Sequence, residues 1–499
     1  MKKFFICLLA LLMLIPLMAA CENTNENVSS AAPSDDGTHK LGDITLTTPI
    51  KDLNGQEFTV LCWDFSAGSK SILGYTGEII YAEDEPGSVD EAKKEVIEYI
   101  EEAYNCKING VMTSTKTVPE IMKEQVLGGG NEYQICFTSL SATAPLVSEG
   151  ILQELNAVPT INLSDPWWDQ NAVKDLSIGN KVYFTLGDIN TYDDQGTWCM
   201  LFNKNMKEKF GITEDFYQLA RDGAWTFDKF AEICTSYDIT SNSNGDGVLD
   251  EKDTWAFGTE TYNIYVHVVA GGQKITKKDN NDLPYICLQN EKEATYSILA
   301  DVLDFYNNQD IVMVADAPPY TNKGFPNVWE ATVHKAFVDG RQLFYMCGLI
   351  HAASFRVMED EFGILPIPKA ADYQDRYYHT VSVGNSTVMS IPSQLENVED
   401  VGTLVTAIAE LSMHKVTPAY YDVQLKYRDS HDDESGEMLD IIFGSRTFDL
   451  GNTFNWGDLR AEYMAMDKNY SSRFDSKLTM ADTEMKKLLK ELQKEGSKQ

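Results

Sequence analysis

The first third of the chain alternates between short apolar runs and longer amphipathic stretches. The run QEFTVLCWDF (56–65) is rich in β-forming residues and predicts a strand. In 88–105, apolar residues from Val89 to Ala103 recur at helical spacing and predict a helix. The alternation continues with CKINGVMT as a strand, TVPEIMKEQVLGGG as a helix and YQICFTS as a strand. Strands that alternate with helices favour parallel βαβ units, so we expect an α/β fold.

After about residue 157 the pattern is less regular, with more aromatic residues and longer loops. We expect helices at 225–236, 291–307, 328–339, 398–414 and 477–499, and strands at 362–368 and 380–393. A chain of 499 residues is too long for a single hydrophobic core and predicts two or more lobes.

The N-terminus has the layout of a secretory signal. Lys2 and Lys3 precede an apolar run, and Ala19, Ala20 and Cys21 follow it. The end of this run resembles a bacterial lipobox, although Met18 stands where Leu is more usual. We therefore expect 1–20 to be a lipoprotein signal peptide and Cys21 to be lipidated; the alternative is an uncleaved N-terminal anchor.

The segment 21–40 is almost free of apolar bulk, so we expect a disordered tether between the lipid and the folded part. The acyl chains on Cys21 would hold the protein at the outer face of a bacterial cell membrane.

Charge and motifs exclude several classes of protein. The formal net charge of −35 argues against binding to nucleic acid or directly to anionic lipid, and is compatible with neutral ligands and cations. No G-x-G-x-x-G follows a predicted strand, so we expect no dinucleotide or other organic cofactor. No C-x-x-C pair occurs among the scattered cysteines, and Cys62 and Cys136 fall in apolar strand-like runs typical of buried thiols.

Several segments, taken in their order along the chain, resemble a known family. They are MLFNKNMKEKFGI (200–212), GAWTFDKFAEIC (223–234), NGDGVLDEKDTWAFG (244–258) and FGILPIPK (362–369). With the preceding lipobox, they resemble the extracellular solute-binding lipoproteins of ABC importers, of the family 1, sugar-binding type.

The resemblance implies a two-lobe periplasmic-binding-protein-like fold (type II) with the ligand cleft between the lobes. By analogy, lobe 1 comprises 41–156 plus 372–430, and lobe 2 comprises 157–371 plus 431–499. It also implies a monomer that captures a carbohydrate, expected to be an oligosaccharide, and delivers it to an ABC transporter permease.

A carbohydrate site needs aromatic faces for stacking and a few fixed polar groups for orientation. The informative aromatic residues stand in loops among polar neighbours, or directly after a strand, where α/β sheets expose their ligand crevices. The predicted ligand-binding residues are Trp63, Asp64, Tyr192, Asp194, Trp198, Tyr262, Trp329 and Trp456. The alternative for each tryptophan is packing, which we expect for Trp225 and favour for Trp167 and Trp168.

The acidic stretch SNSNGDGVLDEKD (241–253) matches the spacing of an EF-hand calcium loop. The predicted ligands are Asn242, Asn244, Asp246, Val248 through its carbonyl, Asp250 and Asp253. The departures are Asn at the first position and Asp rather than Glu at the last. We expect a structural Ca²⁺; the alternative is a metal-free turn.

Three rival functions stay open at this point. A secreted glycosidase-like enzyme would need paired carboxylates, which 76 acidic residues cannot exclude, although no G-x-S-x-G and no H-E-x-x-H occur. A different cargo, such as a peptide or polyamine, would suit an acidic protein. The same fold could also serve a ligand sensor.

Overall fold

The first of two large sheets contains the predicted βαβ units. The computed structural model describes residues 40–64, 77–81, 89–113, 117–421 and 433–496. The sheet has the order β4-β3-β5-β15-β6, in which β3, β4 and β5 are parallel and β15 is antiparallel to both β5 and β6. Its strands are β3 Gln56–Trp63, β4 Cys106–Thr113, β5 Ile135–Ser139, β15 Thr387–Ser390 and β6 Phe184–Thr185. Helices α1 Val89–Ala103 and α2 Val118–Gly128 connect the parallel strands, as predicted.

Local sequence explains these helices. In α1 the apolar spacing buries Val96 and Ile100 against the core. A capping box begins α2: the Glu120 amide donates to Thr117 Oγ1 and the Thr117 amide donates to the Glu120 carboxylate. Gly129 ends the helix in the left-handed conformation, at φ 68°.

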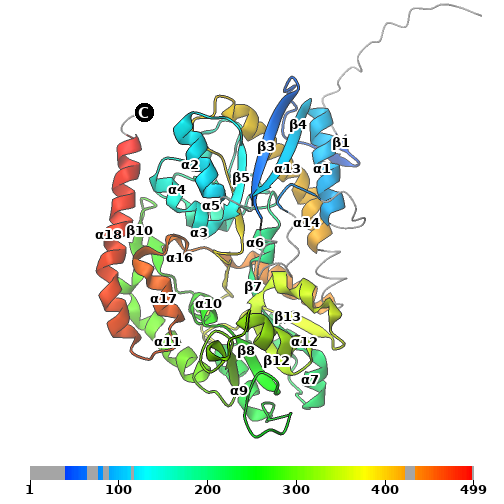
Figure 1. Cartoon of the computed structure of the whole chain (residues 1–499), viewed down its shortest axis with the longest axis vertical. Coiled ribbons are helices and arrows are strands. Elements are labelled where there is room, and N and C mark those ends of the chain that lie inside the picture. Colours follow the sequence, from blue (N-terminus) through cyan, green and yellow to red (C-terminus); the bar gives the residue numbers. More distant parts are fainter. Residues whose placement is uncertain (1–39, 65–76, 82–88, 114–116, 422–432, 497–499) are drawn as a thin grey trace, which may run out of the picture. The chain divides into compact units, whose positions relative to one another are not determined.

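The second sheet repeats the design of the first. Its order is β11-β8-β12-β7-β13, with β8, β11 and β12 parallel and β7 antiparallel to both β12 and β13. The strands are β7 Trp198–Asn203, β8 Trp255–Thr259, β11 Val312–Val314, β12 Gln342–Gly348 and β13 Phe362–Leu365. In each sheet, the chain reaches the antiparallel strand from the other sheet. It runs from β6 in the first sheet to β7 in the second, and from β13 in the second sheet, through the short β14, to β15 in the first. The chain therefore crosses between the sheets and returns (Figure 1).

Most helices predicted beyond residue 157 are present. These are α9 Phe227–Ser236, α11 Lys292–Tyr306, α13 Val398–His414 and α18 Tyr470–Gly496, which begins earlier than predicted. The helix predicted at 328–339 is a π-helical turn, η5 Glu330–His334, followed by α12 Lys335–Val338. The strand predicted at 380–393 is interrupted: β14 His379–Thr380 and β15 are separated by a loop.

The remaining elements are short. The helices are α3 Leu140–Thr143, α4 Pro145–Ser148, α5 Gln170–Leu176, α6 Tyr192–Gln195, α7 Lys204–Lys209, α8 Phe216–Arg221, α10 Tyr262–Ala270, α14 Val416–Pro418, α15 Asp433–Gly444, α16 Leu450–Phe454 and α17 Leu459–Met464. The 3₁₀ turns are η2 Leu155–Ala157, η3 Cys287–Gln289, η4 Tyr320–Lys323, η6 Leu349–Val357 and η8 Trp456–Asp458, and the strands are β1 Lys40–Leu41, β2 Ile44–Thr45, β9 Thr276–Lys278, β10 Pro284–Ile286 and β16 Arg446–Thr447.

The boundaries of the lobes stay a prediction, and the strand pairing bears on one of them. Strand β6 lies in the range predicted for lobe 2, yet it pairs with β15 in the first sheet.

No helix in the described part of the chain combines the length and the apolar character needed to cross a bilayer. Cys62 and Cys136 are fully buried, as predicted.

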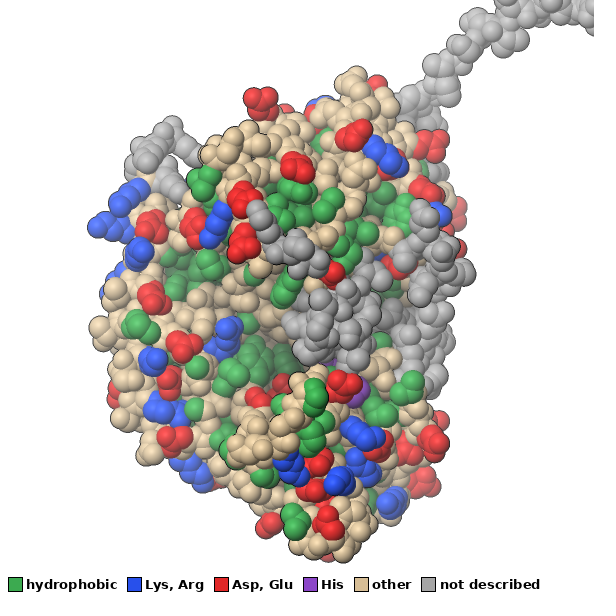
Figure 2. Space-filling view, viewed as in Figure 1, with side chains coloured by type: hydrophobic (Ala, Val, Ile, Leu, Met, Phe, Trp, Pro, Cys, Tyr) green, Lys and Arg blue, Asp and Glu red, His purple; other side chains and the backbone are tan. Residues whose placement is uncertain are grey.

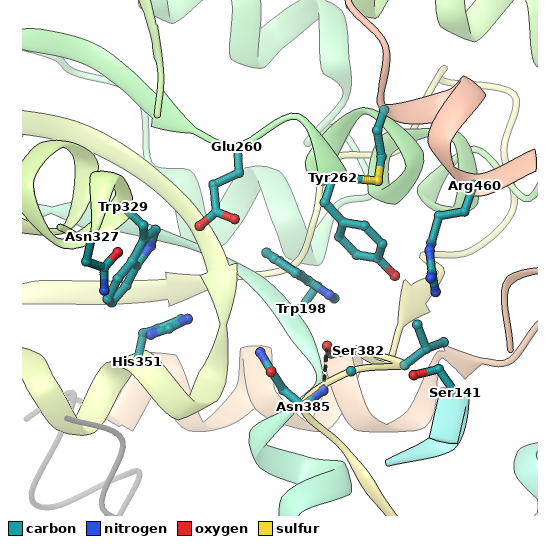
Figure 3. Close-up of a pocket in the computed structure, with 13 residues that line it drawn as sticks. Ser141, Trp198, Glu260, Tyr262, Asn327, Trp329, His351, Ser382, Asn385 and Arg460 are labelled. Atoms are coloured by element: carbon teal, nitrogen blue, oxygen red, sulfur yellow. Dashed lines mark hydrogen bonds between the residues drawn. The ribbon is translucent and has the colours of Figure 1, made fainter. Parts of the chain in front are cut away.

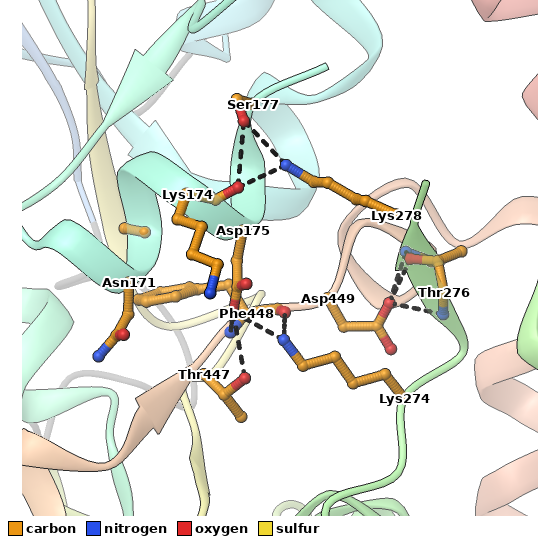
Figure 4. Close-up of polar contacts among 12 residues, drawn as sticks. Asn171, Lys174, Asp175, Ser177, Lys274, Thr276, Lys278, Thr447, Phe448 and Asp449 are labelled. Atoms are coloured by element: carbon orange, nitrogen blue, oxygen red, sulfur yellow. Dashed lines mark hydrogen bonds and ion pairs between the residues drawn. The ribbon is translucent and has the colours of Figure 1, made fainter. Parts of the chain in front are cut away.

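A polar junction joins three segments that are far apart in the sequence (Figure 4). We call it the Asp449 junction; it comprises Asp175 at the end of α5, Lys274 and Thr276 beside the β9–β10 hairpin, and Phe448 and Asp449 after β16. Asp449 receives hydrogen bonds from the amides of Ile275 (2.6 Å), Thr276 (3.0 Å) and Gly451 (2.8 Å) and from the hydroxyl of Tyr265 (2.9 Å). Lys274 Nζ donates to Asp175 Oδ2 and to the carbonyl of Phe448, both at 2.7 Å.

Candidate ligand-binding cavity

A cavity of about 410 Å³ receives side chains from segments of both sheets (Figure 3). Three of its residues follow the carboxyl ends of parallel strands: Ser141 after β5, Glu260 after β8 and His351 after β12. That end of a parallel sheet is where α/β proteins place their ligand sites. The lining residues are Ser141, Trp198, Glu260, Tyr262, Asn327, Trp329, His351, Ser382, Val383, Gly384, Asn385, Arg460 and Met464.

Aromatic rings cover much of the second-sheet side of this cavity. Trp198 begins β7 and Tyr262 begins α10, and their ring centroids are 5.4 Å apart. Trp329 lies against the ring of His351, with centroids 4.6 Å apart. The indole N–H of Trp198 is buried and has no hydrogen-bond partner among the described residues. Flat rings beside an unpaired donor suit a ligand with apolar faces and polar edges.

A carboxyl group and a guanidinium group face the cavity, and neither has a counter-ion among the described residues. Glu260 makes no side-chain hydrogen bond or ion pair within the described part of the chain, and burial, with a smaller contribution from the charge of Asp316, raises the pKa of Glu260 to about 8. Arg460 donates through Nη1 to the carbonyl of Asn452 at 3.3 Å and pairs with no described carboxylate. Figure 3 shows Glu260 and Arg460 on opposite sides of Trp198 and Tyr262.

The first-sheet side of the cavity is polar and small. The amide of Asn385 donates to Ser382 Oγ at 3.1 Å, and the amide of Ser141 donates to the carbonyl of Val383 at 2.9 Å. These bonds fix the loop before β15 against the end of β5. The loop therefore presents hydroxyl and amide groups opposite the aromatic rings. Burial lowers the pKa of His351 to about 3, so its ring is neutral at pH 7.

The structure brings Trp198, Tyr262 and Trp329 together on this cavity, out of the eight residues predicted from sequence. Trp63 ends β3 and packs on a small cluster of Tyr192 and Ile350, and Asp64 follows it, with its amide donating to Thr113. Trp456 is 4% exposed and stacks on Phe454 at 4.9 Å. Trp225, Trp167 and Trp168 are buried, as expected for packing residues.

Asp194 belongs to a buried ion cluster around Arg446, next to the segment that crosses between the sheets. Arg446 Nη1 lies 2.6 Å from Asp194 Oδ1 and 3.2 Å from Asp193 Oδ2, and Nη2 lies 2.9 Å from Asp169 Oδ2. Burial raises the pKa of Asp193 and of Asp194 and brings that of Asp188, nearby, to about 7. The carboxylate of Asp194 therefore pairs with Arg446 and stabilises α6, which lies between β6 and β7.

Sequence reasoning missed Glu260, His351, Arg460 and the loop 382–385. Glu260 could have been found, because it directly follows the strand-like run WAFGT and the rule that selected Tyr262 applies to it equally. His351 follows β12, a strand that was not predicted from the sequence, and Arg460 lies in α17, away from any strand end. Their place depends on how η6 and α17 fold back over the second sheet.

The acidic loop is ordered by its own hydrogen bonds. The buried carboxylate of Asp253 accepts from the amides of Asn244 (3.2 Å) and Asp250 (2.9 Å). Asn242 Oδ1 accepts from the amide of Gly245 at 2.8 Å, and Asp246 Oδ1 accepts from that of Val248 at 2.9 Å. Within the described residues, no group of three His, Cys, Asp or Glu side chains is arranged to hold a metal. Asparagine and carbonyl ligands lie outside that criterion, so the calcium site stays a prediction.

Charge is distributed evenly over the face shown in Figure 2, where acidic and basic side chains are intermixed. A second hollow, of about 460 Å³, borders the Asp449 junction and contains Lys174, Lys274, Lys277 and Lys278. These lysines are interspersed with Asp175, Asp279 and Asp282, so the hollow does not form a basic patch.

Comparisons with known proteins identify the fold. An ABC substrate-binding protein from Listeria monocytogenes, in complex with cycloalternan, has a TM-score of 0.53 at 11% identity over 87% of this chain and 99% of that chain. UspC from M. tuberculosis has a TM-score of 0.54 at 14% identity over 86% and 99%. A cyclo/maltodextrin-binding protein complexed with maltotetraose has a TM-score of 0.53 at 11% identity over 89% and 98%.

At the level of sequence, no family model matches the chain and no curated protein matches it. The likeness is therefore one of fold. The predicted two-lobe, type II periplasmic-binding-protein-like fold is confirmed.

Proposed function

We propose that the protein is an extracytoplasmic solute receptor that captures an oligosaccharide in the cavity around Trp198 and delivers it unaltered to an ABC transporter permease. The observation that carries the proposal is the set of rings of Trp198, Tyr262 and Trp329, at the carboxyl ends of one sheet and opposite polar groups from the other. The similar structures support it, since two of them contain cycloalternan and maltotetraose.

The test is a thermal-shift and calorimetric screen of the mature protein against mono- and oligosaccharides, with a peptide and a polyamine as rival cargoes. A ligand at 100 times its Kd should add about 2.7 kcal/mol to the free energy of unfolding. Trp198→Phe should lower the affinity for the saccharide that binds in the screen. Trp456→Phe, which changes a buried tryptophan outside the cavity, should leave this affinity unchanged. Stabilisation by the peptide or polyamine alone would refute the proposal.

The proposal also implies that the protein is not an enzyme. Incubation with an end-labelled oligosaccharide that binds should return the label on an intact chain. Release of shorter labelled products would favour the glycosidase alternative.

The anchor belongs to the same proposal. The signal 1–20, the lipidation site Cys21 and the tether 21–40 lie outside the described residues, except for Lys40. We expect the expressed protein to partition into detergent and to carry acyl chains on Cys21 by mass spectrometry. Cys21→Ser should release it in soluble form; partitioning that persists in this variant would favour an uncleaved anchor.

For the acidic loop we propose one structural Ca²⁺, on the spacing of Asn242, Asn244, Asp246, Val248, Asp250 and Asp253. Calcium should raise the melting temperature of the apo protein, and magnesium should do so less. Asp246→Ala, at an exposed position, should abolish the difference. Equal melting temperatures with calcium and with chelator would favour a metal-free turn.

A further inference from the structure

Within the described part of the chain, Glu260 differs from the buried carboxylates Glu78, Glu410 and Asp449. Glu78 accepts from the amides of Thr191 (2.9 Å) and Tyr192 (3.0 Å). Asp449 accepts the hydrogen bonds of its junction, and Glu410 accepts from the amide and hydroxyl of Thr48 at 2.8 and 2.5 Å. The carboxylate of Glu260 accepts none from any described residue. A partly buried carboxylate without a donor is costly to the fold, so the fold does not account for its presence.

The surroundings of Glu260 are aromatic rather than cationic. Figure 3 shows its carboxylate pointing into the space between Trp198 and Trp329, with His351 on the far side. The ring of His351 is neutral at pH 7, because burial lowers its pKa to about 3. Arg460 is the cation among the described lining residues, and it lies beyond Tyr262, against the carbonyl of Asn452. Glu260 therefore faces aromatic rings, with no counter-charge beside it among the residues that the structure describes.

These features describe a receptor for a cation. The faces of indole rings attract ammonium groups, and a carboxylate among them supplies charge-assisted hydrogen bonds. A neutral hydroxyl would leave Glu260 protonated, as it mainly is in the free protein at pH 7, whereas an ammonium group pairs with the ionised carboxylate. The net charge of −35 also raises the local concentration of cationic ligands.

We propose that the cavity selects a saccharide bearing an ammonium group, such as a 2-amino-2-deoxy sugar, and that Glu260, Trp198 and Trp329 hold this group. The inference rests on the proposed function and specifies its substrate class. Arg460 at the other side of the cavity repels the ammonium group and so fixes the direction in which the saccharide binds.

The test uses sugar pairs that differ in one group. The affinities of glucose and glucosamine, galactose and galactosamine, and cellotriose and fully deacetylated chitotriose are measured by calorimetry with the full mature protein at pH 6.5. The amino member of at least one pair should bind about 10- to 100-fold more tightly than its neutral partner. Glu260→Gln should remove this preference and change the affinity for the neutral member less than about threefold. Glu293→Gln, an exposed control on α11 outside the cavity lining, should preserve the preference.

A second measurement needs no variant. Glu260 holds a proton in most of the free protein at pH 7, because its pKa is raised to about 8. Binding an ammonium group should expel that proton, so the calorimetric heat should depend on the ionisation enthalpy of the buffer, and binding of the neutral sugar should show less dependence.

Three outcomes would overturn the inference. Neutral members that bind as tightly as their amino partners, or more tightly, would refute the ammonium preference and leave the proposed function intact. A preference that survives Glu260→Gln would refute the role of Glu260. Spermidine binding in the absence of binding by any sugar, charged or neutral, would refute the inference and the proposed function together.

Discussion

The cavity around Trp198 and the Asp449 junction both contain ionisable side chains, but they differ in how those groups are satisfied. At the junction, Asp449 accepts from several amides and two hydroxyls, and Lys274 bridges Asp175 and a carbonyl (Figure 4). In the cavity, Glu260 and Arg460 lack ionic partners among the described residues, and the indole N–H of Trp198 lacks an acceptor.

This difference separates polar groups that serve the fold from those that serve a ligand. A fully satisfied buried network stabilises and orients the segments it joins, and removing one member leaves the others unpaired. Unsatisfied groups around a cavity cost stability and are explained by a partner that arrives from outside. Substitutions at the junction should therefore change stability, and substitutions in the cavity should change affinity.

The substitution Asp449→Ala should have the largest effect, and this effect is on the free energy of unfolding. It would leave the amides of Ile275, Thr276 and Gly451 without their acceptor, and should lower the free energy of unfolding by about 3 kcal/mol. Urea denaturation followed by far-UV circular dichroism measures the change. A loss below about 1 kcal/mol would show that the junction does not hold these segments.

The substitution Trp198→Phe should have the next largest effect, and this effect is on the affinity for the oligosaccharide. The substitution keeps an aromatic ring at the start of β7 and removes the unpaired indole N–H. The affinity for the best oligosaccharide should fall about tenfold, by the value of one hydrogen bond and part of the stacking surface. Calorimetric titration measures it. Unchanged affinity would place the ligand away from Trp198.

A smaller effect depends on pH and concerns Asp188. Its pKa is raised to about 7 in the folded protein, mainly by burial, against about 3.9 in an unfolded chain. The folded state therefore binds the proton more tightly, and stability should fall as pH rises from about 4 to about 7. Asp188→Asn should raise the free energy of unfolding at pH 8 by about 1 to 2 kcal/mol relative to its effect at pH 4. Denaturation curves at both pH values measure this; equal effects would contradict the raised pKa.

The smallest expected effect is that of Lys174→Gln, at the rim of the second hollow. The Lys174 ammonium forms no ion pair within the described residues. Its loss should change the free energy of unfolding by less than about 0.5 kcal/mol and leave oligosaccharide affinity unchanged. Parallel denaturation and binding measurements test this. Loss of sugar binding would mean that the ligand reaches this hollow.

Much of the fold could be predicted because it depends on local pattern. The βαβ units and α13 follow from apolar spacing and caps within a few residues of one another. The break in 380–393 falls at Gly384, Asn385 and Ser386, a turn signal that the strand prediction passed over. The place of β6 in the first sheet depends on pairing with β15, about two hundred residues further along the chain.

The site was predictable where aromatic residues stand next to strands or in loops among polar neighbours. Trp198 begins β7 and Tyr262 follows β8, and their rings lie side by side on one wall of the cavity. Asp194 has the same loop-like sequence context, but its carboxylate is held by Arg446, about 250 residues away in sequence. Trp456 likewise stands among polar neighbours, yet it packs on Phe454. Long-range contacts decide between packing and exposure for such residues, and a single sequence does not reveal them.

The most direct test of the account is a crystal structure of the mature protein with the oligosaccharide that binds most tightly. We expect density for the sugar in the cavity, with a ring stacked on Trp198 or Trp329 and a donor of the ligand within hydrogen-bonding distance of Glu260. A sugar bound at another place, with the rings of Trp198, Tyr262 and Trp329 uncovered, would contradict the account.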